Sequence, residues 1–450
     1  MGIKKLREKF FPVSLKYAIR EQLAYRDFFR CRYPSVMRRY IAKCRKEQNK
    51  TLSSLKTKER IEVAFFLTMP GIWKFDYLFR MFRDDKRYHP FVVVCPYSWF
   101  KDFDNDDIVK TLHRTEQIMK DKGFEYVVPY DESTKKWLDV RKLYNPDIVF
   151  YSVPYKDTVP QYYIYNFRDK LTCYNHYGFS TTDLPVLSYK LPLHQVLWTY
   201  FVETQINMEL GAKYAVSKGE NMVVTGYVAA DVYLDKDYVP VDKWHRTEKP
   251  MKRIIWAPHH SFDDNLNIAT FLDYYDFMLK LAQKYKDEVQ FLFKPHHLLW
   301  FKLCKLWGEQ RTSEYYKQWE TMPNTQVELG EYSDWFFTSD AMMHDCCSFT
   351  TEYMYLNKPA LYLVKDANVI ESKFNEIGVR SLRCHEYALN ENDIEQFVRN
   401  VINGVDNKKE QRNQFYNDLL TKDKRMPSQK IFEYIDNKIF GSASSNTDSQ

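Results

Sequence analysis

No stretch of this sequence approaches the roughly 18 consecutive apolar residues that a membrane-spanning helix needs. The first residues carry too many charges to form the apolar core of a signal peptide. None of the eight cysteines forms a Cys-x-x-Cys pair, and their spacing indicates neither a zinc site nor a disulfide framework. No recognised RNA-binding motif is present. These absences predict a reduced, cytoplasmic protein.

Aromatic residues, in contrast, are abundant. The chain contains 35 Tyr and 31 Phe, and its aromatic fraction is 17%. So much apolar surface can form large cores, which excludes global disorder. A length of 450 residues fits two or three domains.

Positive charge is concentrated at the start of the chain. Residues 1–50 hold 15 Lys and Arg against 4 Asp and Glu, a net charge of +11. The whole chain has a net charge of +6, so the other 400 residues together have a net charge of −5. Bases alternate with aromatic and aliphatic residues at roughly helical spacing. We expect residues 1–59 to form a basic amphipathic helical segment on the anionic inner face of the membrane. A helix that packs on the protein body and an RNA-binding segment are the alternatives.

Residues 60–235 show the pattern of a first α/β domain. Short apolar runs predict strands at 61–67, 91–95, 126–128, 147–151 and 222–231, and amphipathic spacing predicts helices at 75–82, 107–122, 137–140 and 201–213. Strands that alternate with helices at this spacing favour an open parallel sheet. On such sheets, ligands bind at the carboxyl ends of the strands.

A second α/β domain is expected at 253–440, after a polar linker at 236–252 that contains Pro240 and Pro250. Its strands are predicted at 253–257, 289–293, 341–343 and 360–364, and its helices at 271–285, 349–356, 391–401, 410–420 and 431–439. The composition of residues 441–450 is typical of a disordered tail.

The stretch 339–353 is central to the second domain because it is predicted to form a strand, a tight polar turn and a helix. A helix start favours an anion. Ser348 is placed to cap the helix and to donate to a phosphate oxygen, and Glu352 to accept from two ribose hydroxyls. A capped core helix with an acidic first turn is the alternative interpretation.

Histidines also follow predicted strand ends in the second domain. They are His259, His260, His296, His297 and His344. Neighbouring strands would bring these residues into one crevice. Zinc is one interpretation, but no matching carboxylate or cysteine spacing accompanies it. We therefore expect imidazolium ions and Lys294 to surround a diphosphate, since their charge opposes the phosphate charge that builds in a transition state.

The first domain offers two further candidates. His176 and Gly178 follow a strand, where a histidine next to a glycine turn is well placed to face a cleft. The alternative is a histidine whose ring is satisfied by backbone groups within a turn. Gly226 ends another strand and allows close approach of a substrate to the backbone, or forms an ordinary turn.

Several of these motifs resemble the CDP-glycerol glycerophosphotransferase family of teichoic-acid and capsule synthesis. The matching segments are Ile254-Ile255-Trp256-Ala257-Pro258, Lys294-Pro295-His296 and Ser339-Asp340 through Asp345-Cys346-Cys347-Ser348 and Glu352 to Lys358-Pro359. Asn175-His176-Tyr177-Gly178 approximates the family's His-Gly motif, and Gly226-Tyr227-Val228-Ala229-Ala230-Asp231 echoes its Gly-Tyr-Pro-x-x-Asp. The resemblance spans residues 170–365.

The resemblance implies a GT-B fold, in which two Rossmann-like domains face each other across a cleft and no metal or other cofactor is required. It implies that His176 takes a proton from a lipid-linked or glycan acceptor, that glycerol phosphate leaves a CDP-activated donor, and that CMP is released. His296 and Lys294 would neutralise the diphosphate. The substrate-binding set is completed by Gly178, Gly226, His259, His260, Ser261, Asp345, Cys347, Ser348, Thr350 and Glu352.

The sequence departs from the family pattern at several positions. His259-His260-Ser261 stands where the family has an arginine, Cys346-Cys347-Ser348 replaces Tyr-Ser-Ser, Glu352 replaces an aspartate, and Tyr177 splits the His-Gly pair. Two other functions therefore stay open: a GT-B glycosyltransferase that uses a nucleotide sugar, and a non-catalytic relative that binds nucleotide or membrane. No nucleic acid is expected as a partner.

Overall fold

The computed structural model describes residues 34–97, 105–264, 266–366, 368–420 and 425–441. Most of the expected basic segment 1–59 and nearly all of the expected tail lie outside these residues. The chain forms two compact units, each described by itself below. The first unit contains the N-terminal half and the C-terminal helix, and the second contains residues 232–424 together with the short segment 178–184.

The first unit has a parallel sheet of seven strands. Its elements are α3 (Pro34–Leu55), β1 (Ile61–Leu67), α4 (Asp76–Asp84), β2 (Tyr88–Val94), α5 (Asn105–Asp121), β3 (Tyr126–Val127), β4 (Tyr130–Asp131), β5 (Lys136–Trp137), α6 (Val140–Leu143), β6 (Ile148–Tyr151), β7 (Leu171–Asn175), α7 (Pro192–Val196), β8 (Thr199–Val202), α8 (Gln205–Tyr214), β9 (Met222–Val224) and α19 (Pro427–Phe440). The sheet order is β3-β2-β1-β6-β7-β8-β9, with β4 and β5 in a separate antiparallel hairpin.

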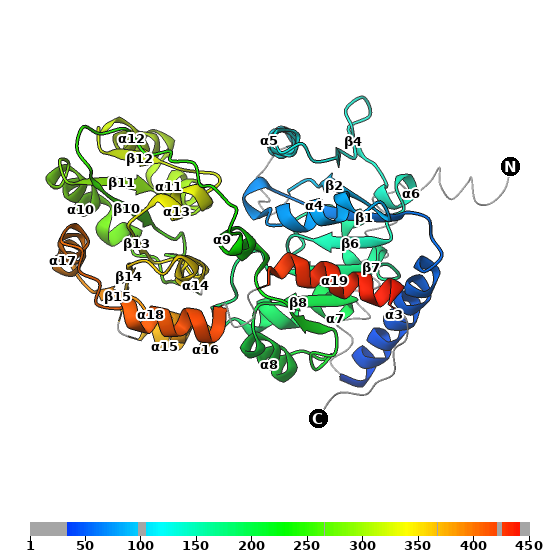
Figure 1. Cartoon of the computed structure of the whole chain (residues 1–450). Helices are drawn as coiled ribbons and strands as arrows, with labels where there is room; N and C mark the ends of the chain where they lie inside the picture. Colours follow the sequence, from blue (N-terminus) through cyan, green and yellow to red (C-terminus); the bar gives the residue numbers. More distant parts are fainter. Residues whose placement is uncertain (1–33, 98–104, 265, 367, 421–424, 442–450) are drawn as a thin grey trace. The chain divides into compact units, whose positions relative to one another are not determined.

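Both faces of this sheet are covered by helices (Figure 1). Side chains alternate along β1, so Phe65 packs towards α4 and α19, whereas Phe66 packs towards α3 and α7. The Phe65 ring stacks on that of Phe150 in the neighbouring strand, with centroids 4.8 Å apart. Each fully buried aromatic or aliphatic side chain of this kind contributes about 2 kcal/mol through the hydrophobic effect.

The described part of the N-terminal segment is a docking helix. Met37, Ile41, Cys44 and Leu55 recur on one face of α3 and are buried against the body of the first unit. The buried Gln48 side chain adds a hydrogen bond to the carbonyl of Val196, at 2.8 Å. The apolar face of this stretch is therefore occupied by the protein itself.

The second unit has a parallel sheet of six strands. Its elements are β10 (Lys252–Ala257), α10 (Phe271–Lys284), β11 (Val289–Phe293), α11 (Leu299–Trp307), α12 (Glu309–Thr321), β12 (Thr325–Val327), α13 (Ser333–Thr338), β13 (Ala341–His344), α14 (Phe349–Glu352), β14 (Ala360–Leu363), α15 (Val369–Lys373), α16 (Glu376–Leu382), β15 (Glu386–Ala388), α17 (Glu391–Ile402) and α18 (Lys409–Phe415). The sheet order is β12-β11-β10-β13-β14-β15.

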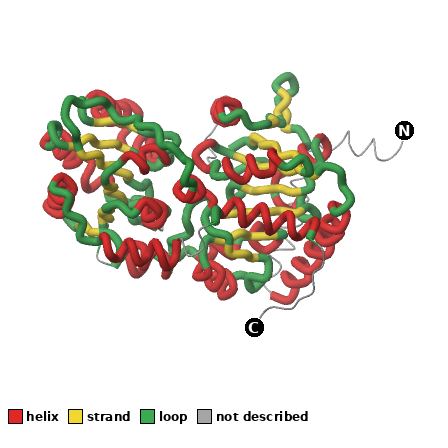
Figure 2. The backbone as a smooth tube through the Cα atoms, in the orientation of Figure 1, coloured by secondary structure: helices red, strands yellow, loops and turns green. Residues whose placement is uncertain are grey.

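The two sheets share one topology, in which the first strand lies next to both the second and the fourth. Figure 2 shows the strands of each unit in yellow, with helices in red beside them. This is the order of a doubly wound Rossmann-like fold, whose ligands bind where the strand order reverses. That position lies between β1 and β6 in the first unit and between β10 and β13 in the second. The predicted α/β, GT-B-like class is confirmed at the level of two Rossmann-like units.

Three local predictions were wrong. Residues Lys136–Trp137 form a short strand because they pair with Tyr130–Asp131, and the helix begins only at Val140. Phe201 and Val202 end strand β8, because their apolar side chains are buried in the sheet, and helix α8 starts at Gln205. The C-terminal helix α19 packs in the first unit, although we expected it to end the second domain.

The segment expected to be a linker, 236–252, has no helix or strand before β10 begins at Lys252. It is nevertheless anchored to the second unit. The Tyr238 hydroxyl donates to Asp334 at 2.6 Å, and the Trp244 ring N–H donates to the Thr338 hydroxyl at 3.0 Å. In the described part of the chain, no helix is long and apolar enough to cross a membrane.

Candidate active site

The carboxyl ends of β10, β11 and β13 bring most of the predicted site residues together in the second unit. The residues that follow these strands are His259, His260, Lys294, His296 and Asp345. Backbone hydrogen bonds fix two of the strand ends relative to each other. The Lys294 N–H donates to the Trp256 carbonyl at 2.8 Å, and the His296 N–H donates to the Pro258 carbonyl at 3.0 Å.

Three histidine side chains form a cluster at this edge of the sheet. Ring centroids are 4.4 Å apart for His259 and His260, 4.8 Å for His259 and His296, and 4.3 Å for His260 and His296. One ring nitrogen of each lies within 4.8 Å of the others. The fourth ring, that of His297, stacks on His296 with centroids 4.2 Å apart. The predicted convergence of these four histidines is observed.

Hydrogen bonds assign the protons on two of these rings. The Nδ1 atom of His259 accepts from the backbone N–H of Ser261 at 3.3 Å, and Nδ1 of His296 accepts from the N–H of Leu298 at 3.1 Å. A neutral imidazole has one donor and one acceptor, so Nε2 carries the proton in both rings. A metal ligand needs a lone pair, whereas these Nε2 atoms offer N–H groups. The cluster is thus better suited to an anion than to a metal ion.

The histidine cluster is neutral at physiological pH. Burial, and then the proximity of the other histidines, lowers the pKa of His259 and His296 well below 6.5. Burial also lowers the pKa of His260 to about 4. The imidazolium ions that we expected from the sequence are therefore absent. The positive charges that act on the rings are those of Lys294, on His296, and of Lys302, on His259 and His260. The Lys294 ammonium lies 5.5 Å from the centre of the Tyr332 ring.

Asp345 holds the backbone of His259 in place through hydrogen bonds. Its buried carboxylate accepts the backbone N–H groups of His259 and Thr270 and the Thr270 hydroxyl, the last at 2.8 Å. Burial raises its pKa to about 6, even though these hydrogen bonds favour the charged form. The carboxylate ties the end of β13 to the loop after β10, so the structure places it as a positioning group for His259, where we had expected contact with phosphate.

Glu352 lies in an aromatic setting. Its buried carboxylate accepts hydrogen bonds from the hydroxyls of Tyr332, at 2.9 Å, and Tyr233, at 3.2 Å. The Tyr233 ring stacks in turn on that of Tyr355, with centroids 6.0 Å apart. Because Tyr332 also lies next to Lys294, these contacts connect Glu352 to the histidine cluster.

The turn at 346–350 differs from the expectation in one respect. Ser348 does not cap the helix with its side chain, because its own backbone is already helical and a capping residue needs an extended one. The Cys347 carbonyl accepts the hydroxyls of Thr350, at 2.5 Å, and Thr181, at 2.9 Å. A Cβ at Gly178 would lie 3.3 Å from the Ser348 side chain. Gly178 and the Ser348 turn are therefore in close contact within the second unit.

His344 was expected in the same crevice, and this was wrong. It is the last residue of strand β13 and is fully buried. Its Nε2 atom lies 3.1 Å from Nε2 of His385, which places it in a separate buried pair. A strand end one residue later than expected turns this side chain into the core.

In the first unit, His176 follows strand β7. The preceding Asn175 is buried and its side chain donates to the carbonyls of Phe201, at 3.0 Å, and Gly226, at 3.1 Å. These bonds hold the end of β7 to β8 and to the glycine turn. His176 itself is half-buried, and its ring stacks on that of Tyr177 with centroids 5.3 Å apart.

Gly226 lies against Pro427, a residue of the same chain, and this contact occupies the space that we had considered for a substrate. Gly226 has a φ of +106°, and a Cβ there would lie 2.8 Å from the Pro427 side chain at the start of α19. The interpretation of Gly226 as a turn is sufficient to explain the glycine, since both the backbone conformation and the packing of Pro427 require it.

A cavity of about 220 Å³ lies at the reversal point of the first sheet. It is lined by residues that follow β1 and β6, among them Thr68, Ser152, Asp157 and Thr158. Each of these four has a buried oxygen without a hydrogen-bond partner among the described residues. Burial raises the pKa of Asp157 to about 7. The sequence interpretation missed Asp157, although a carboxylate six residues after a buried strand end is a signal of the kind used elsewhere.

A family model described as CDP-Glycerol:Poly(glycerophosphate) glycerophosphotransferase matches residues 187–436, more than half of the chain. The chain belongs to this family. The glycerophosphotransferase match covers the histidine cluster, Lys294, Glu352 and Gly226, whereas His176 and Gly178 precede its first residue. Membership assigns the protein to the transferases that move glycerol phosphate in cell-surface polymer synthesis. Among curated proteins, none matches this chain.

Solved structures resemble this glycerophosphotransferase in fold. A variant of the wall teichoic acid polymerase TagF with CDPG is 14% identical, has a TM-score of 0.51, and is matched over 90% of this chain and 98% of its own. S. aureus MnaA with UDP is 15% identical, with a TM-score of 0.53 over 87% of this chain and 100% of its own. A UDP-N-acetylglucosamine 2-epimerase is 13% identical, with a TM-score of 0.54 over 88% and 100%. These similarities support the GT-B-like class.

Proposed function

We propose that this glycerophosphotransferase moves glycerol phosphate, or a related alditol phosphate, from a CDP-activated donor to a hydroxyl of a lipid-linked or glycan acceptor. CMP is the other product. The observation that carries this proposal is the convergence of ring N–H groups and Lys294 at the reversal point of the second sheet, in a chain whose family uses CDP-glycerol.

The donor diphosphate is assigned to the histidine cluster. The Nε2–H groups of His259 and His296 and the ammonium of Lys294 donate to its oxygens, where negative charge builds as the phosphorus–oxygen bond breaks. Neutral donors suit a site that must release CMP afterwards, since they hold the anion less tightly than imidazolium ions would. His260 and Ser261 complete the loop that carries these donors.

The nucleoside part is assigned to the neighbouring turn. Glu352 already accepts two tyrosine hydroxyls, so its carboxylate is oriented to accept ribose hydroxyls in exchange. Cys347, Ser348 and Thr350 line the turn beside it. These roles follow from the position of the residues at the reversal point between β10 and β13.

His176 is proposed as the general base of the acceptor step. It removes the proton from the acceptor hydroxyl, and the oxygen attacks the phosphorus that bears glycerol. The bond from that phosphorus to the bridging oxygen then breaks, and its electron pair leaves with CMP. Histidine suits the role of a general base because it can bind and release a proton near neutral pH.

The cavity at Asp157 is proposed to hold the hydroxyls of the acceptor's terminal alditol. Its unpartnered oxygens can accept and donate to a polyol. Tyr155, which lines this cavity, has its ring 6.4 Å from that of Tyr177, the residue that follows His176. The acceptor and the proposed base thus meet within one unit.

We further propose that the protein works at the inner face of the cell membrane. Residues 1–33 hold nine Lys and Arg against three Asp and Glu, a net charge of +6, which supports attraction to anionic lipids. Because the apolar face of α3 is occupied, any apolar insertion belongs to residues 1–33, which the structure does not describe.

The test is CMP release from CDP-glycerol in the presence and absence of a membrane-derived acceptor. His176→Ala should lower acceptor-dependent CMP release by about 10²- to 10⁴-fold. His113→Ala, at an exposed histidine of α5, is the matched control and should retain wild-type activity. Full activity of His176→Ala would refute the assignment of the base.

Substitution of the family's arginine by the His259-His260 pair keeps a second function open, in which the donor is a nucleotide sugar. The same assay, run with UDP-sugars, separates the two. Release of UDP from a UDP-sugar, without release of CMP from CDP-glycerol, would show that the protein acts as a glycosyltransferase.

A further inference from the structure

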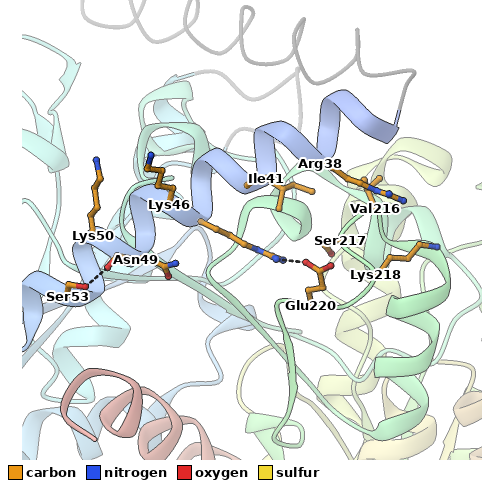
Figure 3. A pocket seen from close by; sticks show the side chains of 12 residues that line it. Arg38, Ile41, Lys46, Asn49, Lys50, Ser53, Val216, Ser217, Lys218 and Glu220 are labelled. Atoms are coloured by element: carbon orange, nitrogen blue, oxygen red, sulfur yellow. Dashed lines mark hydrogen bonds and ion pairs between the residues drawn. The ribbon is translucent and has the colours of Figure 1, made fainter. Parts of the chain in front are cut away.

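A hollow of about 780 Å³ lies between helix α3 and the loop before strand β9, within the first unit (Figure 3). No role in the chemistry above uses it. Its charged lining residues are Arg38, Arg45, Lys46, Lys50, Lys218 and Glu220. Five cations and one carboxylate thus line the hollow.

Most of this positive charge is not neutralised by the residues that the structure describes. Arg45 forms an ion pair with Glu220. Among the described residues, the other four cations form no ion pair, and all four are exposed. Like charges that lie four residues apart on a helix repel each other and destabilise it. An anionic ligand in the hollow would remove this repulsion.

The cations are arranged in a row. Arg38, Lys46 and Lys50 are separated by multiples of four residues, so they follow one ridge of α3 that winds gradually around the helix over about 18 Å of its length. The opposite edge of the helix is anchored by its buried residues and by the hydrogen bond from the Thr51 hydroxyl to the Asp169 carbonyl, at 2.6 Å. A fixed row of this length matches an extended ligand that carries several negative charges.

The composition of the hollow favours a soluble polyanion over a lipid surface. A membrane-bound helix inserts apolar side chains beside its basic ones. The large exposed apolar residues of the described chain include none from α3, and Ile41 at the base of the hollow is buried. Binding here would rest on charge alone.

We propose that this hollow binds the phosphodiester backbone of the growing acceptor polymer. The inference rests on the proposed function, since the family's acceptor is poly(glycerophosphate), which carries one negative charge per repeat. Residues 216–220 precede β9, whereas His176 follows β7, and the strands between them run parallel. The hollow and the proposed base therefore lie at opposite ends of these strands, about 13 Å apart or more.

Because of this separation, binding in the hollow depends on the length of the acceptor. An acceptor of one or two repeats can reach His176 but not the hollow, whereas an acceptor of ten repeats can occupy both. The hollow thus retains long acceptors between additions and has no effect on short ones.

The experiment measures binding and turnover of synthetic glycerol phosphate oligomers of two and ten repeats. Lys46→Glu combined with Lys50→Glu should raise the Kd for the labelled ten-repeat oligomer at least tenfold and reduce the salt dependence of binding. It should raise the KM for the long acceptor and leave the short acceptor unchanged. Lys218→Gln, on the other wall of the hollow, should weaken binding in the same direction. Lys305→Glu combined with Lys317→Glu, on exposed positions of the second unit, is the charge-matched control.

Unchanged binding of the long oligomer by the Lys46/Lys50 variant would overturn the proposal. Loss of binding to phosphatidylglycerol vesicles, with oligomer binding retained, would assign the hollow to lipid instead. Equal affinity for a single-stranded RNA of the same charge would also overturn it. Because binding is measured without CDP-glycerol, a failure of the proposed transferase activity would be recognised separately.

Discussion

A carboxyl group that is buried without a complete set of hydrogen-bond partners destabilises a fold, and Asp157 is in that position. Its Oδ1 atom has no partner among the described residues, and its side chain lines the cavity next to other unpartnered oxygens. A polar group that costs stability and faces a cavity is a candidate for ligand binding. Because its pKa is raised, the cost in folding stability depends on pH and can be measured.

We expect Asp157→Asn to stabilise the protein at alkaline pH. The pKa of this carboxyl is about 7 in the fold and 3.8 as the ordinary value. Below 3.8 both states are protonated and no penalty exists. As the pH rises from 3.8 to 7 only the unfolded state loses its proton, so the wild type loses stability, by about 2–4 kcal/mol in total above pH 7. Thermal unfolding at pH 4 and pH 8 should show a gain for the variant only at pH 8. Asp237→Asn, at an exposed position, should show none.

The same variant tests function. If the cavity holds the acceptor polyol, Asp157→Asn should raise the KM for the acceptor several-fold and leave the KM for CDP-glycerol unchanged. A more stable protein with unchanged acceptor KM would show that the carboxyl is not a binding group.

The neutral histidine cluster predicts proton uptake on donor binding. A diphosphate raises the pKa of His260 above its value of about 4, so the complex binds more protons than the free protein. Affinity for CDP-glycerol, whose diphosphate has no ionisation in this range, should therefore increase as the pH falls from 7 to 5. Calorimetry in two buffers with different ionisation enthalpies measures the uptake. His260→Gln should reduce it, and a pH-independent affinity would contradict a diphosphate at this cluster.

At the scale of single elements, the turn at Gly226 controls how α19 packs. Gly226→Ala places a side chain at a φ of +106° and 2.8 Å from Pro427. We expect a loss of about 1–3 kcal/mol in the free energy of unfolding, since both the strain and the contact oppose folding. Gly71→Ala is the control, because nothing lies within 4 Å of that position. Equal urea midpoints for the two variants would contradict this explanation.

The elements that the sequence predicted best are the continuous apolar strands. β1, β10, β11 and β13 were placed within two residues because an uninterrupted apolar run has few other solutions in a parallel sheet. Strand β8 was missed because the apolar pair Phe201-Val202 also fits the helical spacing of the residues that follow it. The sequence pattern therefore does not separate the end of β8 from the start of α8. The C-terminal helix was predicted, but its partner was not, since the packing of Ile431 on the first sheet depends on contacts far apart in the sequence.

At the scale of the whole molecule, one rule predicted most of the candidate site. Polar residues after strand ends come together at one edge of a parallel sheet, and this placed His259, His296 and Lys294 correctly beside one another. The rule does not give the direction of a side chain. It could not show that Asp345 points inward to backbone N–H groups, nor that mutual burial leaves the histidines neutral.

The short segment 178–184 shows how the two units are connected. It belongs to the second unit, although the chain on either side of it belongs to the first. The Asn375 side chain donates to the Ser180 carbonyl at 2.9 Å, and the Asn375 N–H donates to the Thr181 carbonyl at 2.9 Å. Residue 182 adds a β-bridge to Phe374.

This insertion limits how the protein can be divided. A fragment that begins at residue 232 and ends at 424 would lack the strand-like segment that covers Asn375 and the Cys347 turn, and would expose their backbone groups to water. A nucleotide-binding fragment for crystallography or NMR therefore needs residues 178–184 joined to it by an engineered connection. A fragment whose ends are chosen as one continuous stretch of sequence would lack part of the second folded unit.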